Sequence, residues 1–193
     1  LAESLRDCPG KIVICAGDVS SQTDIETAID TAVAEFGKLD VLINNAGVMD
    51  DMSPIGDATN EKLDSIFAVN VFGPFYGMRK AVNVFKSQGN GGNILGGLRC
   101  AAGAIYCASK AAVISMTKNT SFMYQEAGIR VNAIAPGGIS TEIASSMGMP
   151  NMEGYGRVQK ILAAAPEPGE AADIANAALF LASDESRYIN GDV

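Results

Sequence analysis

Short, mainly apolar runs and longer segments with helical periodicity alternate along the chain. The short runs lie at residues 12–15, 39–43, 94–95 and 129–135, and turn residues follow each of them. Runs of this kind predict buried strands. The third run has two apolar residues where a buried strand usually has about five or six, so this strand looks cut short.

The longer segments repeat apolar residues every three or four positions, which is the spacing of an amphipathic helix. Ser20 or Ser21 can cap the first of these segments, and Gly37 can end it. Helices are predicted at residues 25–36, 60–86 and 104–125, and from about residue 168 onward.

Apolar strands that alternate with helices are typical of a parallel sheet with helices on both faces. The sequence therefore predicts an α/β fold with a doubly wound parallel sheet. Such sheets bind ligands at the carboxyl ends of their strands. Small and polar residues follow three of the predicted strands, at Asp18, at residues 45–47 and at residues 136–141. We expect these residues to converge on one binding site.

Composition and charge narrow the range of functions. With 193 residues, 48% of them hydrophobic and 19% charged, the chain suits a single globular domain. No apolar stretch reaches the roughly 18 residues that a membrane span needs. The net charge is -8 without a basic cluster, which disfavours a nucleic-acid partner.

The sequence contains no histidine, so a Ser-His-Asp site, a Cys-His site and a histidine-liganded metal are all excluded. Any acid–base chemistry must use another group, and we expect no metal. The four cysteines form no C-x-x-C pair. Buried free thiols in a reducing cytoplasm are the favoured interpretation, with disulfides as the alternative.

Two Tyr/Lys pairs have the same spacing of four residues. Tyr106 and Lys110 stand at the start of a predicted helix, and Tyr76 and Lys80 lie within another. Residues four apart share one face of a helix, so an ammonium group can lie near a phenol. The spacing alone does not say which pair, if either, is catalytic.

Several motifs in order resemble those of the classical short-chain dehydrogenase/reductase family. They are NNAG at 44–47, AVNVFGPF at 68–75, YCASK at 106–110, RVNAIAPGGIST at 130–141 and FLASDESRYING at 180–191. The resemblance implies a Rossmann-type fold and an oxidoreductase that uses NAD or NADP on a small alcohol/carbonyl substrate. It also selects Tyr106 and Lys110, because the family's catalytic pair precedes the strand that ends in Pro-Gly. Tyr76 and Lys80 are then an interface or surface pair.

The resemblance further implies the role of each site residue. Tyr106 is the acid/base, Lys110 favours its phenolate and binds the nicotinamide ribose, and Asn70 supports a proton relay. Cofactor contacts are implied for Tyr106 and Lys110, and for Asp18, Val19, Asn45, Ala46, Gly47, Pro136, Gly137, Ile139 and Thr141. From the residues alone, Asp18 could simply close a turn.

The sequence departs from the family pattern in two ways. The N-terminal strand–loop–helix with its glycine-rich turn is absent, as is the last strand, so the choice between NAD and NADP stays open. No serine lies between Asn93 and Tyr106, where the family has a catalytic serine. We therefore expect one domain over residues 1–193, incomplete at both ends, with an internal gap near residues 95–97. The native chain is then longer and has a serine before Gly97.

Because of these gaps a second interpretation stays open: the protein is a non-catalytic relative of the same fold that binds a nucleotide or a partner. The segment at residues 142–165, with Met147, Met149, Met152 and Tyr155, could be a mobile apolar lid over the substrate or could pack under a loop. The resemblance also implies that the helices at residues 60–88 and 104–125 form a subunit interface in a homodimer or homotetramer.

Overall fold

A three-stranded parallel sheet lies at the centre of the molecule. The computed structural model describes residues 5, 9–97 and 102–193. The strands are β1 (Val41–Asn44), β2 (Gly92–Gly97) and β3 (Ile129–Ile134), in the order β1-β2-β3. Ile43 pairs with Leu95, which in turn pairs with Asn132. All three strands thus end at one edge of the sheet.

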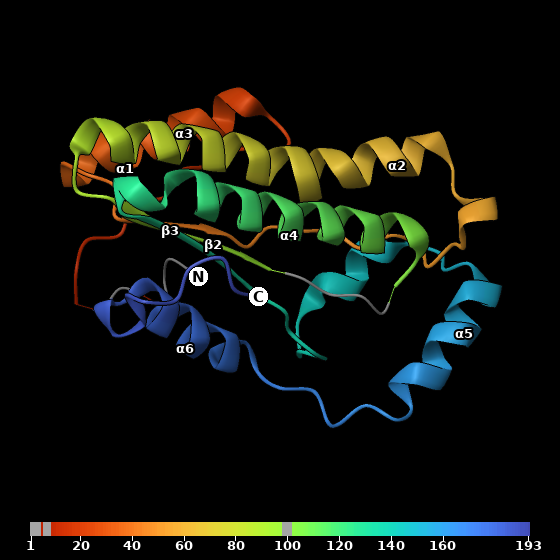
Figure 1. Cartoon of the computed structure of the whole chain (residues 1–193). Coiled ribbons are helices and arrows are strands. Elements are labelled where there is room, and N and C mark those ends of the chain that lie inside the picture. The colour runs from red at the N-terminus through yellow and green to blue at the C-terminus, as the bar shows by residue number, and fades with distance from the viewer. Residues whose placement is uncertain (1–4, 6–8, 98–101) are drawn as a thin grey trace.

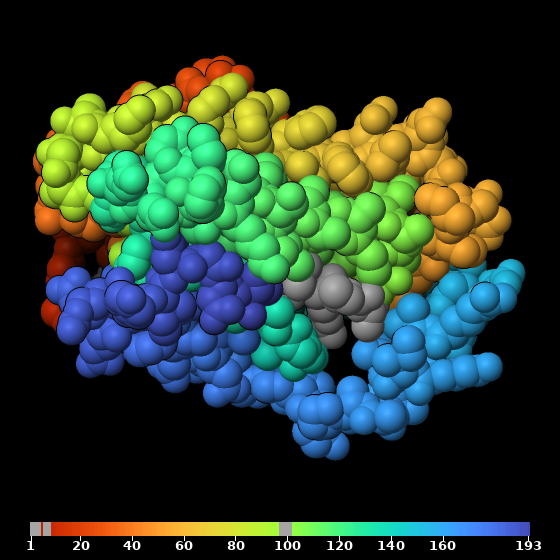
Figure 2. Space-filling view, viewed as in Figure 1, coloured from red at the N-terminus to blue at the C-terminus, as the bar shows by residue number. Residues whose placement is uncertain are grey.

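Helices cover both faces of this sheet, as the pattern predicted (Figure 1). On one face lie α1 (Gln22–Phe36), α2 (Asn60–Phe67), α3 (Gly73–Gln88) and α4 (Ala104–Tyr124), and on the other lies α6 (Ala171–Ala182). Figure 2 shows that α4 forms much of the surface toward the viewer, with α2 and α3 beside it. Helix α5 (Met152–Leu162) stands beyond the carboxyl end of the sheet.

The core lies between the sheet and α3. Ile94, Val131 and Phe85 are all almost fully buried there. A Cβ atom on Gly92 would stand 2.4 Å from the Phe85 ring, so only glycine fits at the start of β2. Because glycines extend β2 on both sides of its two apolar residues, the strand has six residues and is not cut short. The proposed internal gap near residues 95–97 borders residues 98–101, which lie outside the described residues, and it stays a prediction.

The helix predicted at residues 60–86 is divided by a π-helical turn, Ala68–Phe72, between α2 and α3. Such turns insert an extra residue into the helix and are frequent at functional sites. Here the turn carries Asn70, whose side chain is buried. A Cβ atom on Gly73 would lie 2.8 Å from the Val19 carbonyl oxygen, so glycine lets the chain before α1 approach the start of α3.

The strand predicted at residues 12–15 does not form. These residues belong to no strand, and the side chains of Ile12 and Ile14 are 50% and 71% exposed. A strand needs a neighbour to satisfy its backbone groups, and β1, at the edge of the described sheet, pairs only with β2. The expectation of buried thiols is therefore wrong for Cys15, which is exposed. Cys8 and Cys100 lie outside the described residues.

The chain returns to the sheet near its C-terminal end. Backbone hydrogen bonds join Gly191 N to Val131 O and Ala133 N to Asp192 O, both at 2.9 Å. The Arg130 guanidinium donates to the carbonyl oxygens of Leu181, Ser183 and Ile189. Residues 189–192 are thereby held along the free side of β3. None of the helices in the described part of the chain is long and apolar enough to span a membrane.

Candidate active site

Tyr106 and Lys110 lie on one face of the first turns of α4. The Lys110 Nζ atom is 5.3 Å from the centre of the Tyr106 ring, and the tyrosine is 2% exposed. Burial lowers the pKa of Lys110 below its ordinary value, because water solvates the ammonium group less well there. A cation thus lies over a buried phenol.

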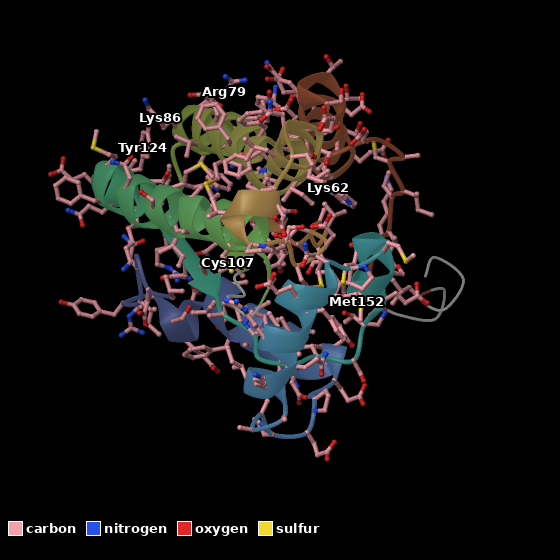
Figure 3. The ribbon with its side chains drawn as sticks, turned by 90° about the vertical axis from the view of Figure 1, so that its right-hand side faces the viewer. Lys62, Arg79, Lys86, Cys107, Tyr124 and Met152 are labelled. Atoms are coloured by element: carbon pink, nitrogen blue, oxygen red, sulfur yellow. The ribbon has the colours of Figure 1, made fainter. Side chains whose placement is uncertain are left out.

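The second Tyr/Lys pair serves another purpose. Lys80 Nζ is 2.6 Å from Asp30 Oδ1 of α1, which ties α3 to its neighbouring helix. Tyr76 contacts the ring of Phe75 and the guanidinium of Arg79 on the same helix. Arg79 is labelled in Figure 3. Neither Tyr76 nor Lys80 lines the cleft described below.

Asn70 links the loop after β1 to α4. Its Oδ1 accepts from Val48 N at 2.9 Å, and its Nδ2 donates to Val48 O at 2.9 Å and to Ser109 Oγ at 3.2 Å. The Ser109 hydroxyl donates in turn to the Tyr106 carbonyl oxygen at 2.7 Å. The π-helical turn places Asn70 deeply enough for these bonds, and the amide holds the strand-end loop against the helix of Tyr106.

Gly47 leaves a narrow space beside these groups. A Cβ atom at this position would lie 3.3 Å from Lys110 Nζ and 3.4 Å from Asn70 Oδ1. The glycine of the NNAG segment therefore lets the backbone after β1 approach Lys110 closely.

Asp50 also contacts α4, and the sequence analysis did not find it. Its carboxylate is 1% exposed and accepts hydrogen bonds from the backbone N–H groups of Met52, Gly103 and Tyr106. Gly103 is the N-cap residue of α4 and has no side chain with which to cap the helix. No spacing in the sequence signals this contact, because 53 residues separate Asp50 from Gly103.

A cleft of about 450 Å³ opens at the carboxyl end of the strands. Residues of β1 and β2 line one part, and Ala171, Ile174, Ala175 and Ala178 of α6 line another. It contains seven of the predicted site residues: Asn45, Tyr106, Lys110, Pro136, Gly137, Ile139 and Thr141.

Four of the predicted cofactor residues lie outside this cleft: Asp18, Val19, Ala46 and Gly47. Val19 and Ala46 line a smaller adjacent pocket of about 130 Å³, which Asn45 also borders. Asp18 lines neither pocket, and its exposed carboxylate accepts from Ser20 N at 2.8 Å. Hydrogen bonds from Ser20 lower the pKa of Asp18. In this structure Asp18 closes the turn before α1.

The segment at residues 142–165 packs against Tyr106 and the loop after β1. It contains a 3-10 helix (Glu142–Met147) and α5, and its Met147 and Tyr155 pack against the buried cluster of Met49, Met52 and Tyr106. Met149 and Met152 are 91% and 73% exposed, and Met152 is marked in Figure 3. Met147 and Tyr155 thus fit the interpretation as a packed segment, and the interpretation as a mobile lid over the substrate stays a prediction.

Comparison with known proteins places this geometry in a family. The family model described as enoyl-(acyl carrier protein) reductase matches residues 1–193. 3β-Hydroxysteroid dehydrogenase 2 of Eggerthella lenta is 40% identical over 199 residues, which cover 100% of this chain and 76% of that protein. The chain belongs to the short-chain dehydrogenase/reductase family.

Solved structures of the short-chain dehydrogenase/reductase family share the fold. A short-chain dehydrogenase/reductase from Mycobacterium marinum superposes with a TM-score of 0.86 at 26% identity, over 99% of this chain and 76% of that one. Carveol dehydrogenase from Mycobacterium avium, in complex with NAD, gives a TM-score of 0.85 at 27% identity, over 99% and 75%.

Members of the short-chain dehydrogenase/reductase family use NAD or NADP, and the described residues fit such a group. The buried Nδ2 of Asn44, which borders both pockets, has no hydrogen-bond partner within the described part of the chain. The space beside Gly47 adjoins Lys110, a hydrogen-bond donor that could bind ribose hydroxyls. Within residues 9–97 and 102–193 no cluster of acidic or cysteine side chains could hold a metal ion.

Proposed function

We propose that this chain carries the catalytic site of an NAD(P)-dependent oxidoreductase that interconverts an alcohol and a carbonyl compound. One observation supports this most directly: the Lys110 ammonium lies 5.3 Å from the ring centre of buried Tyr106, at the wall of a cleft at the strand ends. When bound, the nicotinamide supplies or accepts the hydride.

Tyr106 acts as the acid in one direction and as the base in the other. In the direction of reduction its phenol donates a proton to the carbonyl oxygen, which becomes the hydroxyl of the product. In oxidation the phenolate takes that proton back. The positive charge of Lys110 stabilises the phenolate, which suits a protein without histidine.

Other residues bind the cofactor and pass a proton to or from Tyr106. Lys110 binds the ribose hydroxyls, and Asn70, anchored to Val48 and Ser109, supports the proton relay. The residues proposed to hold the rest of the cofactor are Asp18, Val19, Asn45, Ala46, Gly47, Pro136, Gly137, Ile139 and Thr141.

The substrate is proposed to be a small, apolar ketone or secondary alcohol. The described side chains that pack with Tyr106 on the side of α5 are apolar or aromatic and include Met49, Met52, Met147 and Tyr155. They offer dispersion contacts to an apolar substrate. The similarity to a hydroxysteroid dehydrogenase is consistent with such a substrate.

The protein is proposed to act as a homodimer or homotetramer in the cytoplasm. Large apolar side chains are exposed on the surface formed by α3, α4 and the π-helical turn: Phe72, Phe75, Phe122 and Met123. Exposed apolar groups gathered on adjacent helices often mark an interface. The free, exposed thiol of Cys15 is compatible with a reducing compartment.

A non-catalytic relative is the second candidate. It is favoured by one observation, that the described residues lining the cleft include no serine. Sequencing the coding region across residues 94–102 tests the expectation of a serine before Gly97. If a serine codon is found there, the absence of a serine from the cleft no longer supports the non-catalytic interpretation.

The decisive experiment is an assay of cofactor oxidation with NADH and NADPH separately, using cyclohexanone and a 3-ketosteroid as probes. We expect turnover with one cofactor, and loss of that turnover in the Tyr106→Phe variant. A folded protein that binds cofactor without turning over any ketone or alcohol would favour the second candidate.

A further inference from the structure

Asp50 is a buried carboxylate with an unusual set of partners. Its Oδ1 accepts from Gly103 N at 3.0 Å and from Met52 N at 3.1 Å, and its Oδ2 accepts from Tyr106 N at 2.8 Å. Two of these N–H groups belong to the first turn of α4, where backbone donors have no partner within the helix. The carboxylate therefore caps α4 from the loop after β1.

The charge of Asp50 suits this position. An isolated buried carboxylate is costly, but the N-terminus of a helix carries a partial positive charge that stabilises an anion. All three partners are donors, and an ionised carboxylate accepts through both oxygens. An asparagine would have one acceptor oxygen and would turn an NH₂ group toward a backbone N–H.

The space around Asp50 is fitted to its side chain. A Cβ atom on Gly103 would lie 2.5 Å from Asp50 Oδ2, so the helix can approach the carboxylate only with glycine at this position. The bond to Met52 N holds Met52 at a φ of 63°, an uncommon angle for a residue with a side chain. Asp50 thus fixes two parts of the site, the backbone of Tyr106 and the Met52 wall against which Tyr106 packs.

We propose that Asp50 is a positioning residue that fixes the phenol of Tyr106 relative to Lys110 and to the substrate. It acts through the backbone of Tyr106 and does not touch the reacting atoms. This inference rests on the proposed function, because Tyr106 is taken as the acid/base. Misplacement of a catalytic group by about 1 Å can lower a rate roughly 100-fold.

The first test compares Asp50→Asn and Asp50→Ala with Asp51→Asn. Asp51 is a matched control, because it is the next carboxylate on the same loop and its side chain bonds to Ser53 N and not to α4. We expect kcat for ketone reduction to fall about 10-fold in Asp50→Asn and about 100-fold in Asp50→Ala. We expect the dissociation constant of NADH or NADPH, measured by fluorescence, to stay within about twofold, since the pockets assigned to the cofactor do not include Asp50. Asp51→Asn should keep its kcat.

The second test does not need activity. Hydrogen exchange of the Gly103 and Tyr106 amides, followed by NMR, should become about 10-fold faster in Asp50→Asn than in the parent protein. Exchange in the centre of α4 and in Asp51→Asn should not change. This measurement also shows whether the variants remain folded.

The outcomes separate the two proposals. A parent protein with no turnover of any probe contradicts the proposed function, while the exchange of the two amides still tests the capping by Asp50. Folded Asp50 variants with unchanged kcat overturn the positioning role, even if exchange becomes faster. A loss of kcat accompanied by an equal loss of cofactor affinity also overturns it, because the defect would then extend beyond Tyr106.

Discussion

Lys110 places its ammonium nitrogen 5.3 Å from the centre of the Tyr106 ring, one turn further along the same helix. Both side chains line the cleft at the carboxyl end of the sheet. Asn70 of the π-helical turn contacts this helix through Ser109, and Asp50 of the loop after β1 contacts it through the amides of Gly103 and Tyr106. A buried phenol with a neighbouring cation is thereby held by contacts from two other parts of the chain.

Replacing the phenol should abolish proton transfer and leave binding intact. Tyr106→Phe removes one hydroxyl and keeps the ring that packs with Met49 and Met52. We expect kcat to fall about 100-fold to 10,000-fold, the usual contribution of a positioned acid or base. Steady-state kinetics and a cofactor titration by fluorescence check this. The matched control is Tyr76→Phe, in the other Tyr/Lys pair, and an equal loss in that variant would contradict the assignment.

The buried charge of Lys110 should cost stability in a way that depends on pH. Burial lowers its folded-state pKa below the ordinary value of 10.5. Between these two values the unfolded chain binds more protons, so the contribution of this group to stability rises with pH. We expect Lys110→Met to raise the free energy of unfolding at pH 7, and the gain to shrink as the pH approaches 10.5.

Urea unfolding of the parent and Lys110→Met between pH 7 and pH 10.5 measures this difference. Lys38→Met is the control, because Lys38 is exposed and pairs with Asp40 at the surface. A gain in stability that stays constant over the whole range would contradict burial as the cause. The same Lys110 variant is expected to lose activity.

A methyl group at Gly47 should disturb the site more than the fold. In Gly47→Ala the added Cβ would lie 3.3 Å from Lys110 Nζ and 3.4 Å from Asn70 Oδ1, so these flexible groups must shift. We expect kcat to fall about 10-fold and stability to fall by about 1 kcal/mol. Gly56→Ala is the control, because no atom lies within 4 Å of the added Cβ there. Equal kinetics in the two variants would show that the space beside Gly47 is not used.

A charge on the exposed face of α4 should weaken self-association. Phe122 is 70% exposed, and the next residue, Met123, is 61% exposed. We expect Phe122→Glu to shift the protein toward the monomer in light scattering after size-exclusion chromatography, because a carboxylate would be desolvated in the interface. Tyr188→Glu, at a fully exposed residue outside α4, is the control. A parent protein that is monomeric at all concentrations would contradict the proposed oligomer.

Local chemistry explains why some elements could be predicted closely. The Ser21 side chain accepts from Asp24 N at the start of α1, and Gly37 ends the helix at a positive φ, so both ends are determined within a few residues. The Tyr106/Lys110 pair is likewise a property of one helix. The prediction of a strand at residues 12–15 was wrong, because a strand forms only where a neighbouring strand pairs with it, however apolar its own residues are.

The alternation of strands and helices, the ends of α1 and the family motifs could be read from the sequence, because each depends on residues close together in the chain. The position of Asn70 in a π-helical turn and the capping of the Tyr106 helix by Asp50 became visible in the folded chain, which also favoured the turn-closing alternative for Asp18. These last features depend on space and on backbone donors brought together by folding. The order of residue types along the chain does not predict which backbone N–H groups a carboxylate from a distant segment will bind.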